Sequence, residues 1–483
     1  MKAQARQWML IVIASAGLLA GCAVGPDYKR PPTTPPEAFR GQTGPVEAAS
    51  LADLPWWEVF RDATLQELLQ TALANNYDLR VAVARVEEAR ALAARARGEF
   101  FPSIGYQGAI GRTHLSTEVF GVPSGQAPST QSFFVGLITA SWEPDIWGRI
   151  RRQYEAARAQ FLGTEEARRG VLLSLVSNVA QAYFALLELD AQLDIARRNT
   201  ASFQSTYDLF QRRLGFGVAS TLETSRAEGA LGSAAGTIPD LEQQMAAKEN
   251  EISVLLGRNP GPIPRGTPLF EQPVVPAVPA GLPSVLLERR PDLRQAEQQL
   301  VQANAQVGVA VANFFPRITL SGLGGGVNPE LSGFSNVWSL AAGLTGPIFQ
   351  GGQIRANYQA SVAAWEQAKL QYEQAVITAF KEVASALTAL EKLAQVEAEQ
   401  ARAVKAYADA VQIANKRYRG GLASYYEVLE AQQLLFPAET QLAQIRANRL
   451  STYVQLYKIL GGGWSLTDVQ WNGPQAQAQR QEQ

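Results

Sequence analysis

Cysteine and histidine, two residue types common in catalytic and metal sites, are almost missing from this chain of 483 residues. It contains one cysteine, Cys22, and one histidine, His114. A lone cysteine excludes a disulfide within the chain, and a lone histidine offers no cluster of metal ligands. The sequence also lacks a Gly-Lys-Ser/Thr phosphate loop and a nucleophile elbow. We therefore expect no enzyme activity, no bound cofactor and no metal site.

Unbalanced charge and long apolar runs are also missing. The chain has 43 Lys and Arg residues against 44 Asp and Glu residues, a net charge of −1. Nucleic-acid binding requires a basic face, so that class of partner is excluded. No apolar run of 18 or more residues follows residue 19, which excludes a typical membrane-spanning helix. If the chain crosses a membrane, a closed β-barrel is the remaining way to do so.

The N-terminus resembles a secretory signal with a lipid attachment site. Lys2 and Arg6 precede an apolar run at residues 8–19, which ends in Leu-Ala-Gly-Cys at 19–22. A charged start, a short apolar run and small residues are typical of a signal peptide, predicted here over 1–21. Leu-Ala-Gly-Cys resembles a bacterial lipobox, so we expect Cys22 to carry a covalent lipid. Such acyl chains anchor a protein but do not make it span the bilayer.

The sequence contains a duplication. Asn-Tyr-Asp-Leu-Arg at 76–80 returns as Arg-Pro-Asp-Leu-Arg at 290–294, and in both copies Phe-Phe-Pro follows at the same distance. Further on, residues 213–220 return as 417–424, ten residues closer together than the first pair. A repeat of about 200 residues is far longer than a solenoid repeat, so each copy must be a module of several elements.

Each copy shows the same order of predicted elements. A helix (65–99 in the first copy) leads to a β-hairpin of glycine, aromatic and β-branched residues, predicted at about 103–143 and again at about 317–349. A very long helix follows, at about 149–213 in the first copy. Its apolar residues alternate in steps of three and four, which indicates coiled-coil packing: Leu172, Leu175, Val179, Ala182, Leu186, Leu189, Leu193 and Ala196.

Each long helix ends in a glycine-containing turn. Ser220 and Ser424 follow these turns and are suited to cap the returning helices, at 221–256 and 425–460. At roughly 1.5 Å per residue, the long helices would measure about 95 Å. Two hairpins give four strands, too few to close a barrel, whereas three chains would supply twelve.

We expect the following division of the chain: 1–21 signal peptide, 22–62 lipidated N-terminal tether, 63–259 first repeat, 260–283 Pro-rich linker, 284–463 second repeat, and 464–483 C-terminal tail. The fold class is mixed but mainly α, a duplicated unit of long coiled-coil helices with two β-hairpins.

Four segments carry a resemblance to a known family. They are 22–28, 282–294, 313–318 and 346–356, the last reading Gly-Pro-Ile-Phe-Gln-Gly-Gly-Gln-Ile-Arg-Ala. They resemble the lipoprotein branch of the TolC-like outer-membrane factors, the group of OprM and NodT. The resemblance implies a homotrimer with a twelve-stranded outer-membrane β-barrel, continued by a periplasmic α-barrel. It implies an exit duct for a tripartite pump, with a periplasmic adaptor and an inner-membrane transporter as partners.

The resemblance also implies a gate at the second turn. In this family the periplasmic tip is closed by a tyrosine three residues before the turn glycine, together with two acids on the returning helix. The spacing is matched here by Tyr418, Gly421, Glu427 and Glu430. Three-fold symmetry would gather these carboxylates into a cation-favouring ring. Solvated helix residues are the alternative reading, and Ala423 replaces the arginine that often precedes the acids.

The two turns differ in sequence. The first copy has Glu223 and Arg226 where the second has two acids. We therefore predict that the second turn is the gate, and that the first contributes more to docking of the adaptor. The residues predicted for the tip turns and docking are Arg213, Gly217, Ser220, Arg417, Gly421 and Ser424.

The main interpretation is the outer-membrane channel of an efflux pump of the resistance-nodulation-division type, passive and lipid-anchored. Two alternatives stay open at this point. The chain could be the exit duct of a type I protein secretion system, or a coiled-coil spacer lipoprotein that conducts nothing.

Overall fold

The computed structural model describes the chain outside residues 1–22, 43–49, 115–129, 274–279, 329–334 and 472–483. It contains two compact units. The strand unit comprises Met1–Pro32, Val86–Thr164 and Ala296–Tyr372, and the helical unit comprises Thr33–Arg85, Glu165–Gln295 and Glu373–Gln483. Each unit draws on both copies of the duplicated sequence, so neither copy forms a compact body by itself.

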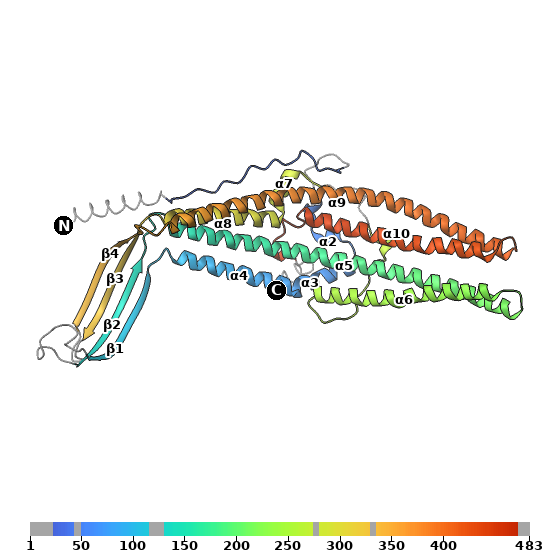
Figure 1. The fold of residues 1–483 in the computed structure, drawn as a ribbon, viewed down its shortest axis with the longest axis horizontal. Helices are drawn as coiled ribbons and strands as arrows, with labels where there is room; N and C mark the ends of the chain where they lie inside the picture. The colour runs from blue at the N-terminus through green and yellow to red at the C-terminus, as the bar shows by residue number, and fades with distance from the viewer. Residues whose placement is uncertain (1–22, 43–49, 115–129, 274–279, 329–334, 472–483) are drawn as a thin grey trace, which may run out of the picture. The chain divides into compact units, whose positions relative to one another are not determined.

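Four antiparallel strands form one sheet in the strand unit, in the order β1-β2-β3-β4 (Figure 1). They are β1 (Ser103–His114), β2 (Thr130–Trp142), β3 (Arg317–Asn328) and β4 (Ser335–Thr345). Both predicted hairpins are confirmed. Because β2 also pairs with β3, the hairpins of the two copies join into a single sheet, which the sequence did not predict.

The register places the large apolar side chains of the sheet on one face. Ile104 lies opposite Ala140, and Tyr106 lies opposite Ile138. The most exposed large apolar side chains are all on this face: Ile104, Tyr106, Ile110, Ile138, Trp338, Leu340 and Leu344. The other face includes polar side chains, among them Gln107, Thr139, Ser321 and Ser339. An alternation of this kind gives the sheet one apolar and one more polar side.

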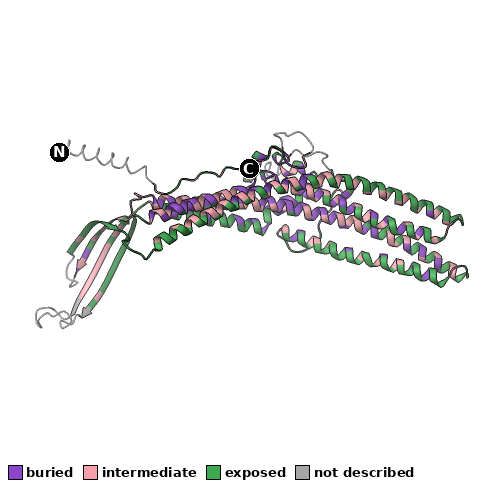
Figure 2. Ribbon diagram, turned by 45° about the horizontal axis from the view of Figure 1, so that its top comes forward, coloured by how far each residue is buried: buried purple, intermediate pink, exposed green. Residues whose placement is uncertain are grey.

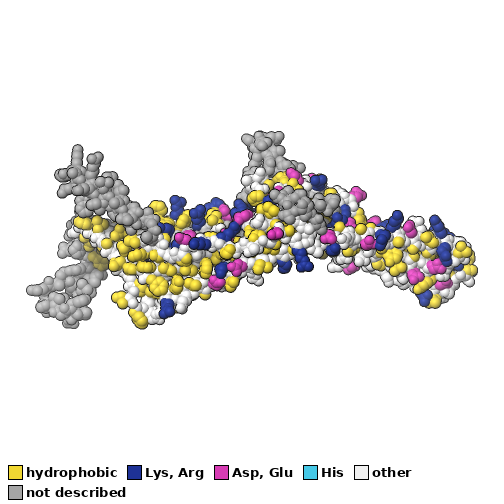
Figure 3. Space-filling view, turned by 90° about the horizontal axis from the view of Figure 1, so that it is seen from above, with side chains coloured by type: hydrophobic (Ala, Val, Ile, Leu, Met, Phe, Trp, Pro, Cys, Tyr) yellow, Lys and Arg dark blue, Asp and Glu magenta, His cyan; other side chains and the backbone are white. Residues whose placement is uncertain are grey.

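Charged residues are scarce in the sheet. Arg112 and Arg317 are the charged residues within the four strands, and both lie near strand ends. Lys, Arg, Asp and Glu side chains are instead spread over the helices (Figure 3). Strands of 11 to 13 residues with an uncharged middle have the length and composition of strands that cross a bilayer.

The helices are α2 (Trp56–Val59), α3 (Ala63–Asn75), α4 (Tyr77–Gly98), α5 (Arg149–Gly215), α6 (Thr221–Leu255), α7 (Pro283–Arg289), α8 (Pro291–Ala312), α9 (Gln353–Arg419), α10 (Tyr425–Ile459) and α11 (Asp468–Trp471). Short 3₁₀ turns lie at Leu51–Asp53 and Leu269–Glu271. The long and returning helices of both copies are confirmed.

The prediction of one continuous helix over 65–99 is wrong. The chain breaks at Asn76, whose side-chain oxygen accepts a hydrogen bond from the amide of Leu79 at 2.9 Å and thereby caps α4. Its amide group donates to the carbonyl of Leu255 at 3.0 Å. A side chain that satisfies backbone groups of two helices stabilises this break more than continuation of the helix would.

Helix α5 provides the core of the helical unit. All eight residues of its predicted coiled-coil stripe are buried, with Val179 and Leu186 completely enclosed. Residues 171–196 of this helix are almost all buried or half-buried, and the buried positions of the fold lie mostly in the helices rather than in the strands (Figure 2). One stretch of α5 is apolar enough to cross a membrane, but 67% of it is buried within the chain. That burial is typical of a core helix.

The matching stripe of α9 is only partly buried. Val376, Val383 and Leu387 are buried, whereas Phe380, Leu390 and Ala394 are half-buried. Phe380 contacts Phe39 of the N-terminal segment, with ring centroids 6.3 Å apart. The two long helices therefore share a sequence pattern but not the same surroundings.

Candidate functional site at the helical turns

The first turn joins α5 to α6 and has a complete helix cap. Gly217 has a φ of +72°, and the amide of Val218 donates to the carbonyl of Arg213 at 2.9 Å. Ser220 begins α6 in a capping box with Glu223, whose carboxylate accepts a hydrogen bond from the Ser220 amide at 2.8 Å. Hydrogen bonds from the backbone and side chain of Ser220 lower the pKa of Glu223 below its ordinary value.

The second turn has the same backbone but a different cap. Gly421 has a φ of +70°, and Ser424 occupies the expected cap position without a side-chain hydrogen bond to the helix. Glu427, which corresponds to Glu223, instead forms an ion pair with Arg417, with 3.3 Å between Nε and Oε2. This exposed pair replaces the capping box, so the second returning helix starts with less local stabilisation.

Contacts between the two turns join the predicted gate to the predicted docking residues. Arg213 donates a hydrogen bond to the hydroxyl of Tyr418 and lies over its ring, 5.9 Å from the centroid. Tyr418 packs edge-on against Tyr425, at 5.2 Å between ring centroids. The structure therefore brings Arg213 and Tyr418 into one cluster, although the sequence assigned them to different turns with different roles.

This aromatic cluster is completed by Tyr425 and Phe210, with Thr206 beside them. None of the three was predicted from the sequence as part of the site. The rings of Tyr425 and Phe210 lie 4.9 Å apart at 82°, and the Tyr425 hydroxyl is hydrogen-bonded to Thr206. Burial raises the pKa of Tyr425. Residues 206, 210 and 213 recur at helical spacing on one face of α5, a signal that could have pointed to this contact.

The two acidic residues predicted for the gate lie on the exposed side of α10. Glu427 and Glu430 are both exposed. Arg417 supplies Glu427 with an ion-pair partner from the same hairpin. Glu430 has no ion-pair partner within the part of the chain that the structure describes. Both carboxylates are thus available at the surface of a single chain.

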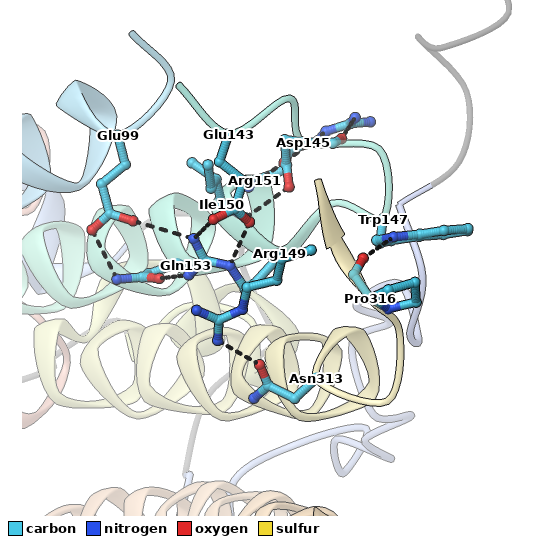
Figure 4. A network of polar contacts seen from close by, with 11 residues as sticks. Glu99, Glu143, Asp145, Trp147, Arg149, Ile150, Arg151, Gln153, Asn313 and Pro316 are labelled. Carbon is cyan, nitrogen blue, oxygen red and sulfur yellow. Dashed lines mark hydrogen bonds and ion pairs between the residues drawn. The ribbon is translucent and has the colours of Figure 1, made fainter. Parts of the chain in front are cut away.

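A polar network fixes the sheet to the start of α5 (Figure 4). Arg149 forms two hydrogen bonds of 3.0 Å with the carboxylate of Glu143. Asp145 accepts hydrogen bonds from the first amides of α5, including that of Ile150 at 2.9 Å. Trp147 donates to the carbonyl of Pro316 at 2.8 Å and therefore links this junction to the second hairpin. These contacts hold the strands of both copies at one place.

Residues 23–32 of the predicted tether are extended but packed onto the strand unit, whereas residues 51–59 form two short helical turns. The amide of Val24 donates to the carbonyl of Trp147 at 3.0 Å, and Arg152 binds Asp27 at 2.7 Å. A side chain at Gly25, whose φ is +96°, would lie 2.5 Å from the Cα of Gly308. Cys22 itself lies outside the described residues. Ala23, the next residue, lies beside Gly148, just before the start of α5.

The described residues contain no group of three or more His, Cys, Asp or Glu side chains that could hold a metal ion. His114 is the last residue of β1. The candidate functional features are the exposed acids Glu427 and Glu430, the aromatic cluster around Tyr418, and the packed N-terminal segment.

Comparison with known proteins identifies the family. Residues 68–258 and 282–462 match the outer membrane efflux protein family. The solvent efflux pump outer membrane protein SrpC of Pseudomonas putida is 35% identical over 463 residues, which cover 93% of this chain and 97% of SrpC. The cation efflux system protein CusC of Escherichia coli O6:H1 is 34% identical over 462 residues, covering 94% of this chain and 98% of CusC.

A solved structure supports the same assignment. The outer-membrane channel OprN superimposes with a TM-score of 0.83 at 30% identity, over 92% of this chain and all of the OprN chain. The match includes both the long helices and the sheet, because it covers nearly the whole chain. The chain belongs to the outer membrane efflux protein family, the outer-membrane channel components of tripartite efflux pumps.

Proposed function

We propose that three copies of this chain form one passive exit duct of a resistance-nodulation-division type pump. The observation that carries the proposal is the four-stranded sheet. Within the described residues, β1 and β4 each pair on one side only, and open edges are unfavourable in a bilayer. Three such sheets supply twelve strands, an even number within the range of outer-membrane barrels. The apolar face would contact lipid, and the more polar face would line the channel.

The gate is proposed at Tyr418, Glu427 and Glu430. The two exposed carboxylates of each chain would come close to the symmetry axis, where a ring of acids favours cations over anions. The contact of Arg213 with Tyr418 supports a role in holding the tip closed, because it links the two helical hairpins. Release of that contact would allow α9 and α10 to move away from α5 and α6.

The adaptor is proposed to dock on the exposed turns, at Arg213, Gly217 and Ser220 in one hairpin and Arg417, Gly421 and Ser424 in the other. The partners of the trimer would be this periplasmic adaptor and an inner-membrane transporter. Relatives of nearly equal identity are named for the efflux of solvents and of cations. The choice of substrate is therefore assigned to the other pump components and not to this channel.

Lipidation is proposed at Cys22. The packing of Val24 against Trp147 and of Gly25 against Gly308 supports it, because these contacts would hold the acyl chains at the level where the strands enter the membrane. Cys22→Ser should abolish incorporation of labelled fatty acid. Retained labelling would remove this assignment.

Planar-bilayer recording tests the duct and its gate. The double variant Glu427→Ala/Glu430→Ala should conduct more and lose cation preference, because six carboxylates leave the aperture. Glu228→Ala, an exposed acid on α6, is the matched control and should behave like wild type. Unchanged conductance and cation preference in the double variant would reject the gate, whereas a wild-type protein that never conducts would reject the duct itself.

A further inference from the structure

A cavity of about 560 Å³ lies in the helical unit, away from the turns. It is bounded by α5, α9, α10 and residues 265–270. Its volume falls within the range of small-molecule binding sites. The floor is apolar, because Leu187, Ile195 and Leu269 line it and are each at most 5% exposed. Phe270, 48% exposed, lies at its edge.

Three carboxylates and two guanidinium groups line the same cavity. Arg265 binds Asp190 at 3.0 Å. Arg198 binds Asp194 at 3.1 Å and Glu439 at 3.3 Å. Arg265 is further neutralised by Glu249, with which it also forms an ion pair. The lining therefore carries an excess of negative charge above an apolar floor, an arrangement that disfavours anions.

Glu439 has an acceptor that the protein leaves unused. Its side chain is 18% exposed, and one oxygen accepts a hydrogen bond from Arg198. The other oxygen, Oε2, is buried and has no hydrogen-bond partner among the described residues. Arg198, the ion-pair partner of Glu439, is shared with Asp194, so the negative charge of Glu439 is only partly matched within the cavity.

We propose that this cavity binds amphiphilic organic cations. The ammonium group would pair with the partly exposed carboxylate of Glu439, and the hydrocarbon or aromatic part would lie on the apolar floor. A neutral ligand would leave the excess negative charge unmatched. This site is distinct from the proposed gate, because Glu439 lies twelve residues beyond Glu427, about 18 Å along α10.

Dansylcadaverine tests the proposal, because its fluorescence rises in apolar surroundings and its primary amine is protonated at neutral pH. The matched probe is its N-acetyl derivative, which keeps the aromatic part but is neutral. The purified trimer should bind the amine roughly 10- to 100-fold more tightly than the neutral probe, the difference expected for a charge-assisted hydrogen bond. Equal affinities would overturn the proposal.

Two variants locate the bound probe. Glu439→Gln should reduce affinity for the amine by about tenfold and leave the neutral probe unchanged. Ala191→Phe places a ring in the cavity and should weaken binding of the amine while the trimer still forms. Glu228→Gln, at an exposed acid on α6, is the control, with wild-type affinity expected. Loss of binding in Glu430→Gln with retention in Glu439→Gln would assign the probe to the gate and refute the cavity.

Discussion

The junction between the two hairpins depends on a glycine that admits no side chain. A Cβ atom at Gly325 would lie 2.0 Å from the carbonyl oxygen of Gly136 and 2.9 Å from the Cα of Leu137. Ordinary Cβ contacts are 3.4 to 4 Å. The neighbouring Gly324 lies in the same strand, and nothing is within 4 Å of a Cβ placed there. These adjacent residues form a matched pair for substitution.

Gly325→Ala should separate β2 from β3, because both clashing atoms belong to the backbone and cannot rotate away. Overpacking costs about 1–3 kcal/mol, and loss of two ladder hydrogen bonds adds about 1 kcal/mol each. The total of about 3–5 kcal/mol is a large part of the stability of a typical domain. The cost occurs three times in a trimer.

The assay is the amount of trimer in purified outer membranes, together with the thermal unfolding of the solubilised protein. Gly325→Ala should reduce the assembled trimer strongly and lower its unfolding temperature, whereas Gly324→Ala should match wild type. Equal assembly of both variants would show that the hairpins do not meet at this register. Equal loss in both would mean that glycine is needed for flexibility and not for space.

Two further predictions concern the first cap and the N-terminal segment. Glu223→Gln should speed hydrogen exchange in the first turn of α6 at neutral pH, and an unchanged exchange rate would contradict the capping box. Because the pKa of Glu223 is lowered in the folded protein, the wild-type turn should lose its protection as the pH falls through that lowered pKa. Gly25→Ala should detach residues 23–32, because Gly25 has a positive φ and its backbone lies against Gly308. Trypsin should therefore cleave this segment faster in the variant than in wild type, and equal cleavage rates would contradict the packing.

Local patterns predicted the elements of this fold well. Steps of three and four marked the stripe of α5 that the structure buries completely, and period-two alternation marked both hairpins. The prediction from sequence was wrong at Asn76. Its cap on Leu79 is local, but its bond to Leu255, which helps to hold the break, depends on a residue far along the chain. Good helix formers on both sides concealed that break.

The candidate site was predicted only in part. The turn glycines and the residues around them follow from local backbone requirements, and the resemblance supplied Tyr418, Glu427 and Glu430. The contact of Arg213 with Tyr418 joins residues from different copies, so no local pattern contains it. The same holds for the cavity at Glu439, whose lining comes from segments more than 200 residues apart.

The sequence by itself determined the duplication, because the two copies can be compared directly. It also determined the long helices, the hairpins and the turns, because each depends on residues that are close together in the chain. Only the tertiary structure decided how the copies combine. Asp62 illustrates the difference: its carboxylate accepts hydrogen bonds from Tyr183, from the amide of Thr267 and from Gln272, three partners far away in sequence. Such contacts satisfy a buried charge through the fold, and neither periodicity nor composition encodes them.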